Sequence, residues 1–144
     1  IEAVRATQKA GLIASGSFVL GLPDEDEHTI KDTIKFAKYL RSDYLQFVLA
    51  APYPGTEFYS LAEKEGLLEL DSIADIDGTR GPIVRTRHLS KAQLAGWQRK
   101  AYISYYTSPR IILTNLKHMT NIYDILRLAR GLKAVFARIM FLKK

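Results

Sequence analysis

The sequence predicts an α/β protein whose first half alternates strands with helices and whose second half is helical. Within the first 66 residues the spacing of apolar side chains switches between the helical and the strand pattern, with Gly or Pro at the switches. Two strands joined by one helix must run parallel, with a right-handed crossover. The balance of acidic and basic residues also differs between the two halves of the chain. Residues 1–79 carry 7 Lys and Arg against 14 Asp and Glu, whereas residues 80–144 carry 14 against 1.

Composition excludes several kinds of chemistry. The 144 residues contain no cysteine, so they hold no disulfide, no thiolate zinc site, no iron–sulfur cluster and no cysteine nucleophile. The three histidines, at 28, 88 and 118, lie too far apart for a local metal-binding spacing. No apolar stretch approaches the ~20 residues of a membrane span, so we expect a cytoplasmic protein. Because the chain enters directly into a helical pattern at Ile1, we expect it to be a segment of a longer protein.

The first strand and helix are predicted for residues 13–41. An opening helix ends at Gly11, because glycine favours the positive φ found just past a helix C-terminus. The strand over residues 13–20 contains small residues that allow a backbone or a ligand to approach closely. After a turn at Gly21, a helix over residues 26–41 follows. Its apolar face is predicted to contain Ile30, Ile34, Ala37 and Leu40.

A second strand and helix follow at residues 44–66. The strand over residues 44–51 is too short for a helix and is rich in Phe and Val. A turn then leads to a helix through Gly66, which Thr56 caps. From residue 67 to 87 the periodicity is lost, which indicates an extended connector. Asp75-x-Asp77-Gly78 in this connector resembles part of a calcium loop, but Thr86 stands where the closing carboxylate belongs, so we expect no calcium site.

The rest of the chain is predicted to be helical. Ser90 and Gln93 form a capping box, which starts a helix with Leu94, Trp97, Ala101 and Tyr105 along one side. Pro109 suits the first turn of another helix, and residues 121–141 form a last helix with a broad apolar stripe. The sequence thus predicts an α/β part at residues 1–70, a connector at 71–89 and a helical region at 90–144.

The carboxyl ends of the two predicted strands form the candidate ligand site, because parallel strands present these ends at one edge of the sheet. Gly21 allows a flat ligand to approach the backbone, and Pro52 stiffens the second loop, although it equally suits an ordinary rigid turn. The four acids at residues 24–27 suit either the binding of an amine, ribose or metal or the capping of the next helix. Among them we expect a functional role only for Glu25.

Three sequence blocks carry a resemblance to a known family. They are Val-Leu-Gly-Leu-Pro-x-Glu at 19–25, Thr-Ile-x-x-Thr-Ile-x-Phe-Ala at 29–37, and Pro-Tyr-Pro-Gly-Thr-x-Phe at 52–58. Residues 7–68 resemble the carboxyl-terminal part of radical S-adenosylmethionine (SAM) enzymes. The resemblance is to the branch with an amino-terminal cobalamin-binding domain, which includes methylases and proteins like the anaerobic magnesium-protoporphyrin IX monomethyl ester cyclase.

The resemblance implies a fold and a set of binding residues. The fold is a partial (βα)6 barrel like that of the TIM barrel, of which this chain supplies the last two strand–helix units before an all-helical tail. The implied role is to form part of the SAM adenine pocket. The residues that match the family pattern for this role are Val19, Leu20, Gly21, Glu25, Leu49, Ala50 and Pro52.

The resemblance also implies cofactors and partners. Radical SAM enzymes of this branch use SAM, a [4Fe-4S] cluster and cobalamin. The cysteine triplet that ligates the cluster is absent here, so we expect no catalytic or metal-ligating residue in this chain and no activity of the chain alone. Expected partners are the N-terminal remainder of the same protein and a lipid or tetrapyrrole-like small molecule that undergoes methylation, cyclisation or oxidoreduction. A sheet edge without its parallel partner also predicts self-association.

An alternative interpretation is a non-catalytic module. The predicted last helix combines an apolar stripe with basic residues, which also describes a helix lying on an anionic membrane surface or against a protein partner. Nucleic acid is a less favoured partner, because the sequence contains no base-stacking platform and no groove-reading motif.

Overall fold

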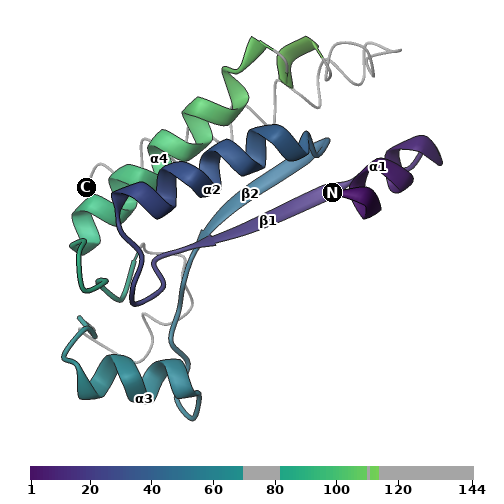
Figure 1. Ribbon diagram of the computed structural model, residues 1–144. Coiled ribbons are helices and arrows are strands. Elements are labelled where there is room, and N and C mark those ends of the chain that lie inside the picture. The colour runs from purple at the N-terminus through teal and green to yellow at the C-terminus, as the bar shows by residue number, and fades with distance from the viewer. Residues whose placement is uncertain (70–81, 110, 114–144) are drawn as a thin grey trace.

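The computed structural model describes residues 1–69, 82–109 and 111–113 (Figure 1). In chain order, the elements are α1 (Glu2–Lys9), β1 (Ser15–Leu20), α2 (Glu27–Leu40), β2 (Tyr44–Leu49), α3 (Glu57–Lys64) and α4 (Lys91–Tyr106). Strands β1 and β2 pair in parallel, with Ser15 opposite Tyr44 and Leu20 opposite Leu49. The predicted α/β class and the parallel pairing are therefore confirmed. The sheet of the described residues has two strands, which does not amount to a barrel.

Local signals in the sequence set the ends of the helices. Asp26 and Ser90 each form a capping box, at the starts of α2 and α4, and Thr56 caps α3 by accepting the N–H of Tyr59. The opening helix ends as predicted, since Gly11 follows it with a φ of 75°. Both strands are two residues shorter than predicted. At β2 the reason is that pairing stops where Pro52 approaches, because proline has no N–H to donate.

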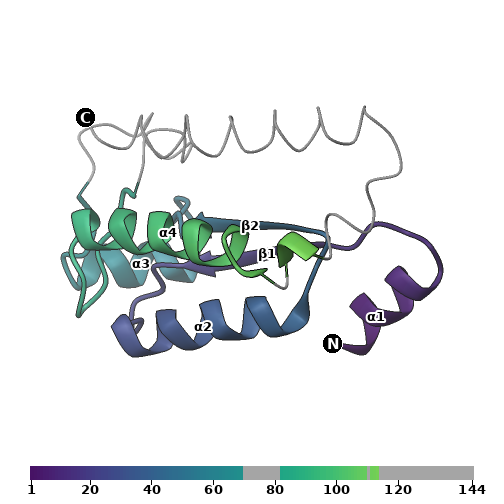
Figure 2. The same ribbon diagram turned by 90° about the horizontal axis from the view of Figure 1, so that it is seen from above.

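Helices α2 and α4 cover one face of the sheet (Figures 1 and 2). The core between the helices and the sheet is an apolar cluster of buried side chains, of which five are at most 1% exposed: Leu20, Ile30, Phe47, Leu94 and Tyr105. Burial of these side chains provides the main favourable free energy that holds the helices on the sheet. The opposite face of β1 is exposed and carries the side chains of Ser15, Ser17 and Val19.

Helix α4 also closes one edge of the sheet. The Tyr106 hydroxyl donates to the carbonyl oxygen of Leu45 at 2.8 Å, and the Phe47 carbonyl accepts 2.8 Å and 3.2 Å hydrogen bonds from Gln98 and Tyr102. The same two hydroxyls accept the strand's N–H groups at 3.4 Å and 3.1 Å. Because alternate residues of a strand face opposite edges, these are the groups of β2 that point away from β1. No strand among the described residues pairs with the outer edge of β1.

The described end of the predicted connector is packed against the fold. Ile83 and Val84 are buried, and Val84 joins a second apolar cluster with Ala62 and Leu67 next to α3. An antiparallel bridge pairs Leu68 with Val84. The predicted calcium-like segment at 75–78 and the predicted last helix lie outside the described residues. Within the parts that are described, no group of three His, Asp or Glu side chains is placed to hold a metal ion, and no helix is long and apolar enough to cross a membrane.

Candidate functional site

The two strand ends meet as the sequence predicts. The N–H of Ala50 donates a 2.7 Å hydrogen bond to the carbonyl oxygen of Leu20, which continues the β1–β2 pairing by one residue beyond Leu49. The next residue after Leu20 is Gly21, with a φ of 93°, a conformation that a side chain at this position would strain. The backbone of Gly21 therefore turns sharply beside Ala50, at the carboxyl edge of the sheet.

The candidate cofactor-binding residues differ in exposure. Val19 is 46% exposed and lies opposite Val48 on the face of the sheet that α2 and α4 leave open. Leu49 and Glu25 are partly exposed, whereas the remaining four are buried: Leu20, Gly21, Ala50 and Pro52. On the covered side, a Leu94 methyl lies 3.5 Å from where a Cβ on Gly21 would stand. Leu94 therefore occupies the covered side of Gly21, whereas the opposite face of the sheet, which carries Val19, is exposed.

Glu25 stabilises the Gly21 turn through hydrogen bonds within the turn itself. Its carboxylate accepts a hydrogen bond from the N–H of Gly21, and its own N–H donates to the Leu22 carbonyl oxygen at 2.9 Å. Burial raises the pKa of the Glu25 carboxyl above its ordinary value of 4.5, although the N–H groups of Gly21 and Leu22 oppose the shift. Asp26 adds a smaller upward shift of this pKa. The geometry gives Glu25 a structural task at Gly21, and the predicted contact with a cofactor stays a prediction.

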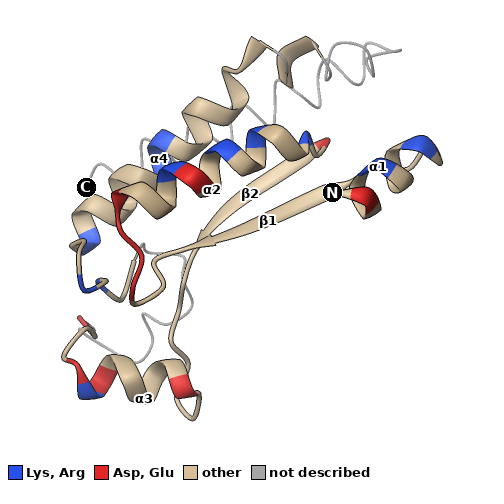
Figure 3. Cartoon of the chain, viewed as in Figure 1, with Lys and Arg blue, Asp and Glu red and all other residues tan. Residues whose placement is uncertain are grey.

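Of the other three acids of this run, Asp26 and Glu27 have partners in α2, whereas the partner of Asp24 is distant in the sequence. Asp26 caps α2 by accepting the N–H groups of His28 and Thr29 at 2.8 Å, and these bonds lower the pKa of its carboxyl. Glu27 lies 3.5 Å from Lys31, and Asp24 pairs with Arg87. Figure 3 shows this acidic segment leading into α2.

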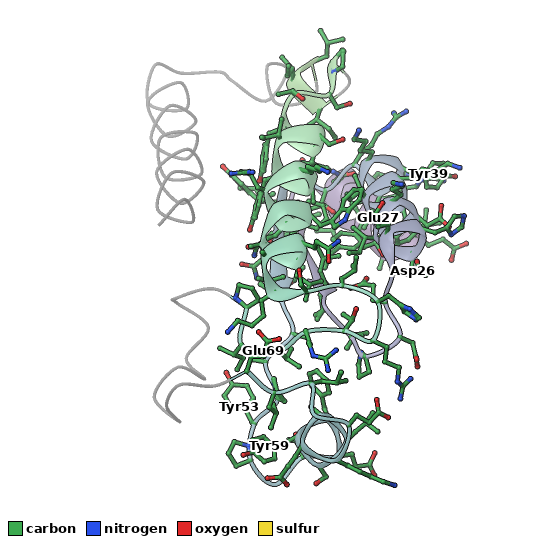
Figure 4. All side chains as sticks on the ribbon, turned by 90° about the vertical axis from the view of Figure 1, so that its left-hand side faces the viewer. Asp26, Glu27, Tyr39, Tyr53, Tyr59 and Glu69 are labelled. Carbon is green, nitrogen blue, oxygen red and sulfur yellow. The ribbon has the colours of Figure 1, made fainter. Side chains whose placement is uncertain are left out.

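The acids at the start of α2 do not face the second strand's loop. Figure 4 shows Asp26 and Glu27 beside α2, away from Tyr53 and Tyr59, which lie next to α3. The four acids therefore do not converge on one ligand, and the capping interpretation holds for Asp26.

Sequence reasoning missed two residues that contact the Gly21 turn. Thr86 donates its hydroxyl to the Glu25 carbonyl oxygen at 2.8 Å, and the N–H of Arg87 donates to the Pro23 carbonyl oxygen at 3.0 Å. Both residues stand in the segment that was predicted to be an extended connector. No local pattern identifies them, because their partners lie about 60 positions earlier in the chain.

The fold and this strand-end geometry define an α/β protein with a candidate small-molecule site at the carboxyl edge of a parallel sheet. No family model matches the chain. A protein of Pyrococcus horikoshii named as an uncharacterized methyltransferase is 39% identical over 136 residues, which is 94% of this chain. Those residues make up 29% of the relative, so the chain spans less than a third of its length.

Proposed function

We propose that this chain forms one wall of the SAM site of a methyltransferase. The observation that carries the proposal is the hydrogen bond between Leu20 and Ala50, which holds the Gly21 turn beside the start of the second loop. The methyltransferase name of a relative that aligns with 94% of the chain supports the same class of reaction. SAM would supply the methyl group, and this chain would hold its adenine.

The residues of the wall have distinct tasks in this proposal. The exposed side chain of Val19 and its neighbour Val48 offer an apolar surface to the flat adenine ring. Gly21 leaves the backbone accessible at the end of that surface, since it carries no Cβ. Leu20, Ala50 and Pro52 are buried, so they shape the site through the backbone and the core.

The finer proposal is that the complete protein is a radical SAM enzyme with a partial (βα)6 barrel. The blocks at 19–25 and 52–58 support it, and so does the outer edge of β1, where no strand of the described residues pairs and a further strand would fit. The residues of this chain do not fit a [4Fe-4S] cluster, because the sequence has no cysteine. A cluster and a cobalamin would therefore be held by other parts of the protein, and a lipid or tetrapyrrole-like substrate is proposed on the resemblance alone.

A SAM titration of the full-length protein by calorimetry tests the site. We expect Val19→Arg to lower the SAM affinity by roughly tenfold, equivalent to ~1.4 kcal/mol, because it places a long charged side chain over the adenine surface. Tyr44→Arg is the matched control. Tyr44 is 45% exposed on the same face of the sheet, at the opposite end from Val19.

A second pair of variants tests the turn. Gly21→Ala strains a backbone with a φ of 93° at the site, whereas Gly11→Ala imposes a comparable strain at a φ of 75°, far from it. We expect only Gly21→Ala to weaken SAM binding. Wild-type protein that binds no SAM, or equal affinities for Val19→Arg and Tyr44→Arg, would remove the assignment.

A further inference from the structure

Thr86 and Arg87 contact the turn between Gly21 and Asp26. Three contacts join this turn to residues 86 and 87. The Arg87 N–H donates to Pro23, the Thr86 hydroxyl donates to the carbonyl of Glu25, and the Arg87 guanidinium pairs with Asp24. Two of these hydrogen bonds are accepted by backbone carbonyl groups of the turn. They therefore constrain the backbone conformation of the turn directly.

Arg87 links the turn to a second element. Its Nε donates a 2.7 Å hydrogen bond to Glu65, just after α3, and another nitrogen of the same guanidinium binds the second oxygen of that carboxylate. This fork geometry requires arginine, because the ammonium of lysine cannot present two parallel donors. The two carboxylates raise the pKa of Arg87, and Arg87 lowers the pKa of Glu65. The guanidinium thus stays charged between Asp24 and Glu65.

Thr86 is buried, with 1% of its surface exposed. Its hydroxyl oxygen accepts the N–H groups of His88 and Leu89 at 3.1 Å and 2.8 Å while it donates to Glu25. Glu25 in turn holds Gly21 through its carboxylate. A continuous chain of bonds therefore runs from the segment before α4 to the residue at the candidate site.

We propose that Arg87 and Thr86 are positioning residues for the SAM site, acting through Asp24 and Glu25 on the conformation of Gly21. This inference rests on the proposed function for its effect on SAM, but the positioning of the turn stands on the contacts alone. None of the hydrogen bonds and ion pairs of these two residues involves Val19. Their loss loosens the turn, and ligand binding must then restore its order.

Hydrogen–deuterium exchange of the full-length protein tests the positioning without any ligand. In Arg87→Ala we expect faster exchange in peptides covering residues 20–26, and unchanged exchange in β2, whose N–H groups bind β1 and α4. The matched control is Arg85→Ala. The side chain of Arg85 is 40% exposed against 38% for Arg87, and it pairs with Glu69 and Gly66 instead of the turn. Equal exchange of residues 20–26 in the two variants would overturn the inference.

SAM titration gives the second measurement. We expect Arg87→Ala to weaken SAM binding roughly threefold to tenfold, Arg87→Lys to restore part of the loss, and Arg85→Ala to bind as the wild type does. Thr86→Val removes the hydroxyl at nearly constant volume and should weaken binding, whereas Thr86→Ser should retain most of it.

The outcomes separate the two proposals. If the wild type binds no SAM, the proposed function fails while the exchange experiment still decides the positioning. If the wild type binds SAM and Arg87→Ala binds it equally well, only the inference fails. In a double-mutant cycle of Arg87→Ala with Asp24→Ala, positioning predicts that the two losses of SAM affinity are not additive. Strict additivity would mean that Arg87 acts by another route than Asp24.

Discussion

The carbonyl oxygen of Leu20 lies 2.7 Å from the backbone nitrogen of Ala50 and accepts a hydrogen bond from its N–H. Leu20 is fully buried between the sheet and the helices, whereas Val19, one position earlier, lies on the open face. The same strand end therefore anchors the core with one residue and presents the candidate ligand surface with its neighbour.

Truncation of Leu20 separates these two tasks. We expect Leu20→Ala to lower the free energy of unfolding by about 2–5 kcal/mol, because it leaves a cavity in a packed core. Val19→Ala, at an exposed position, should change it by about 0.5 kcal/mol or less. Urea unfolding monitored by circular dichroism measures both. Similar losses of unfolding free energy in Leu20→Ala and Val19→Ala would contradict the assignment of Leu20 to the covered face and Val19 to the open face.

The hydroxyls that close the edge of β2 give a second prediction. Replacing both Tyr102 and Tyr106 by Phe removes hydrogen-bond partners of the outward backbone groups of Leu45 and Phe47. We expect the free energy of unfolding to fall by about 0.5–1.5 kcal/mol for each hydrogen bond removed. An open strand edge also promotes edge-to-edge pairing. Sedimentation velocity should then show more self-association than in the wild type, with Tyr39→Phe on the exposed face of α2 as control. Unchanged stability and unchanged sedimentation would contradict the closing role.

Ser42 offers a stabilising substitution. Its Oγ is buried and has no hydrogen-bond partner among the described residues, while a Cβ on Gly16 would come within 2.9 Å of it. We expect Ser42→Ala to raise the free energy of unfolding by roughly 1 kcal/mol, since it removes an unsatisfied polar group. Gly16→Ala should lower the free energy of unfolding less in the Ser42→Ala variant than in the wild type. Thermal unfolding of the four proteins measures both effects, with the exposed Ser15→Ala as control, and a loss of stability in Ser42→Ala would show that the hydroxyl is satisfied.

Titration of Glu25 predicts a pH dependence with a definite sign. Burial raises the pKa of this carboxyl in the folded state above 4.5, so the folded protein binds more protons than the unfolded chain between the two values. Its contribution to stability is present at low pH and is lost as the pH rises through the raised pKa. Glu25→Gln keeps an oxygen for the Gly21 N–H and does not titrate.

The expected result is that the stability of the wild type relative to Glu25→Gln falls as the pH rises above 4.5. Urea unfolding across pH 4 to 7 measures this difference, and Glu57→Gln on the exposed surface controls for the loss of one acidic group. A difference that rises with pH would mean that the hydrogen bond from Gly21 outweighs burial.

The sequence by itself determined the local structure. Capping residues such as Asp26 and Ser90, the positive-φ glycine at Gly11 and the apolar periodicity act within a few residues of chain, so the elements and the parallel pairing could be predicted without coordinates. The sequence also predicts that Leu94, Ala101 and Tyr105 share one side of a helix, and all three are buried. The predicted SAM contacts, in contrast, rest on the resemblance and await the titrations.

Only the tertiary structure decided which distant groups meet. The hydrogen bonds from Tyr106 to Leu45 and from Thr86 to Glu25 each join residues 61 positions apart in the sequence. The contact between Arg87 and Asp24 joins residues 63 positions apart. The directions of these side chains depend on how α4 and the segment before it pack against the sheet, and no local spacing encodes that packing. Burial likewise gave the neighbours Val19 and Leu20 opposite roles, because successive residues of a strand point to opposite faces and the helices cover only one of them.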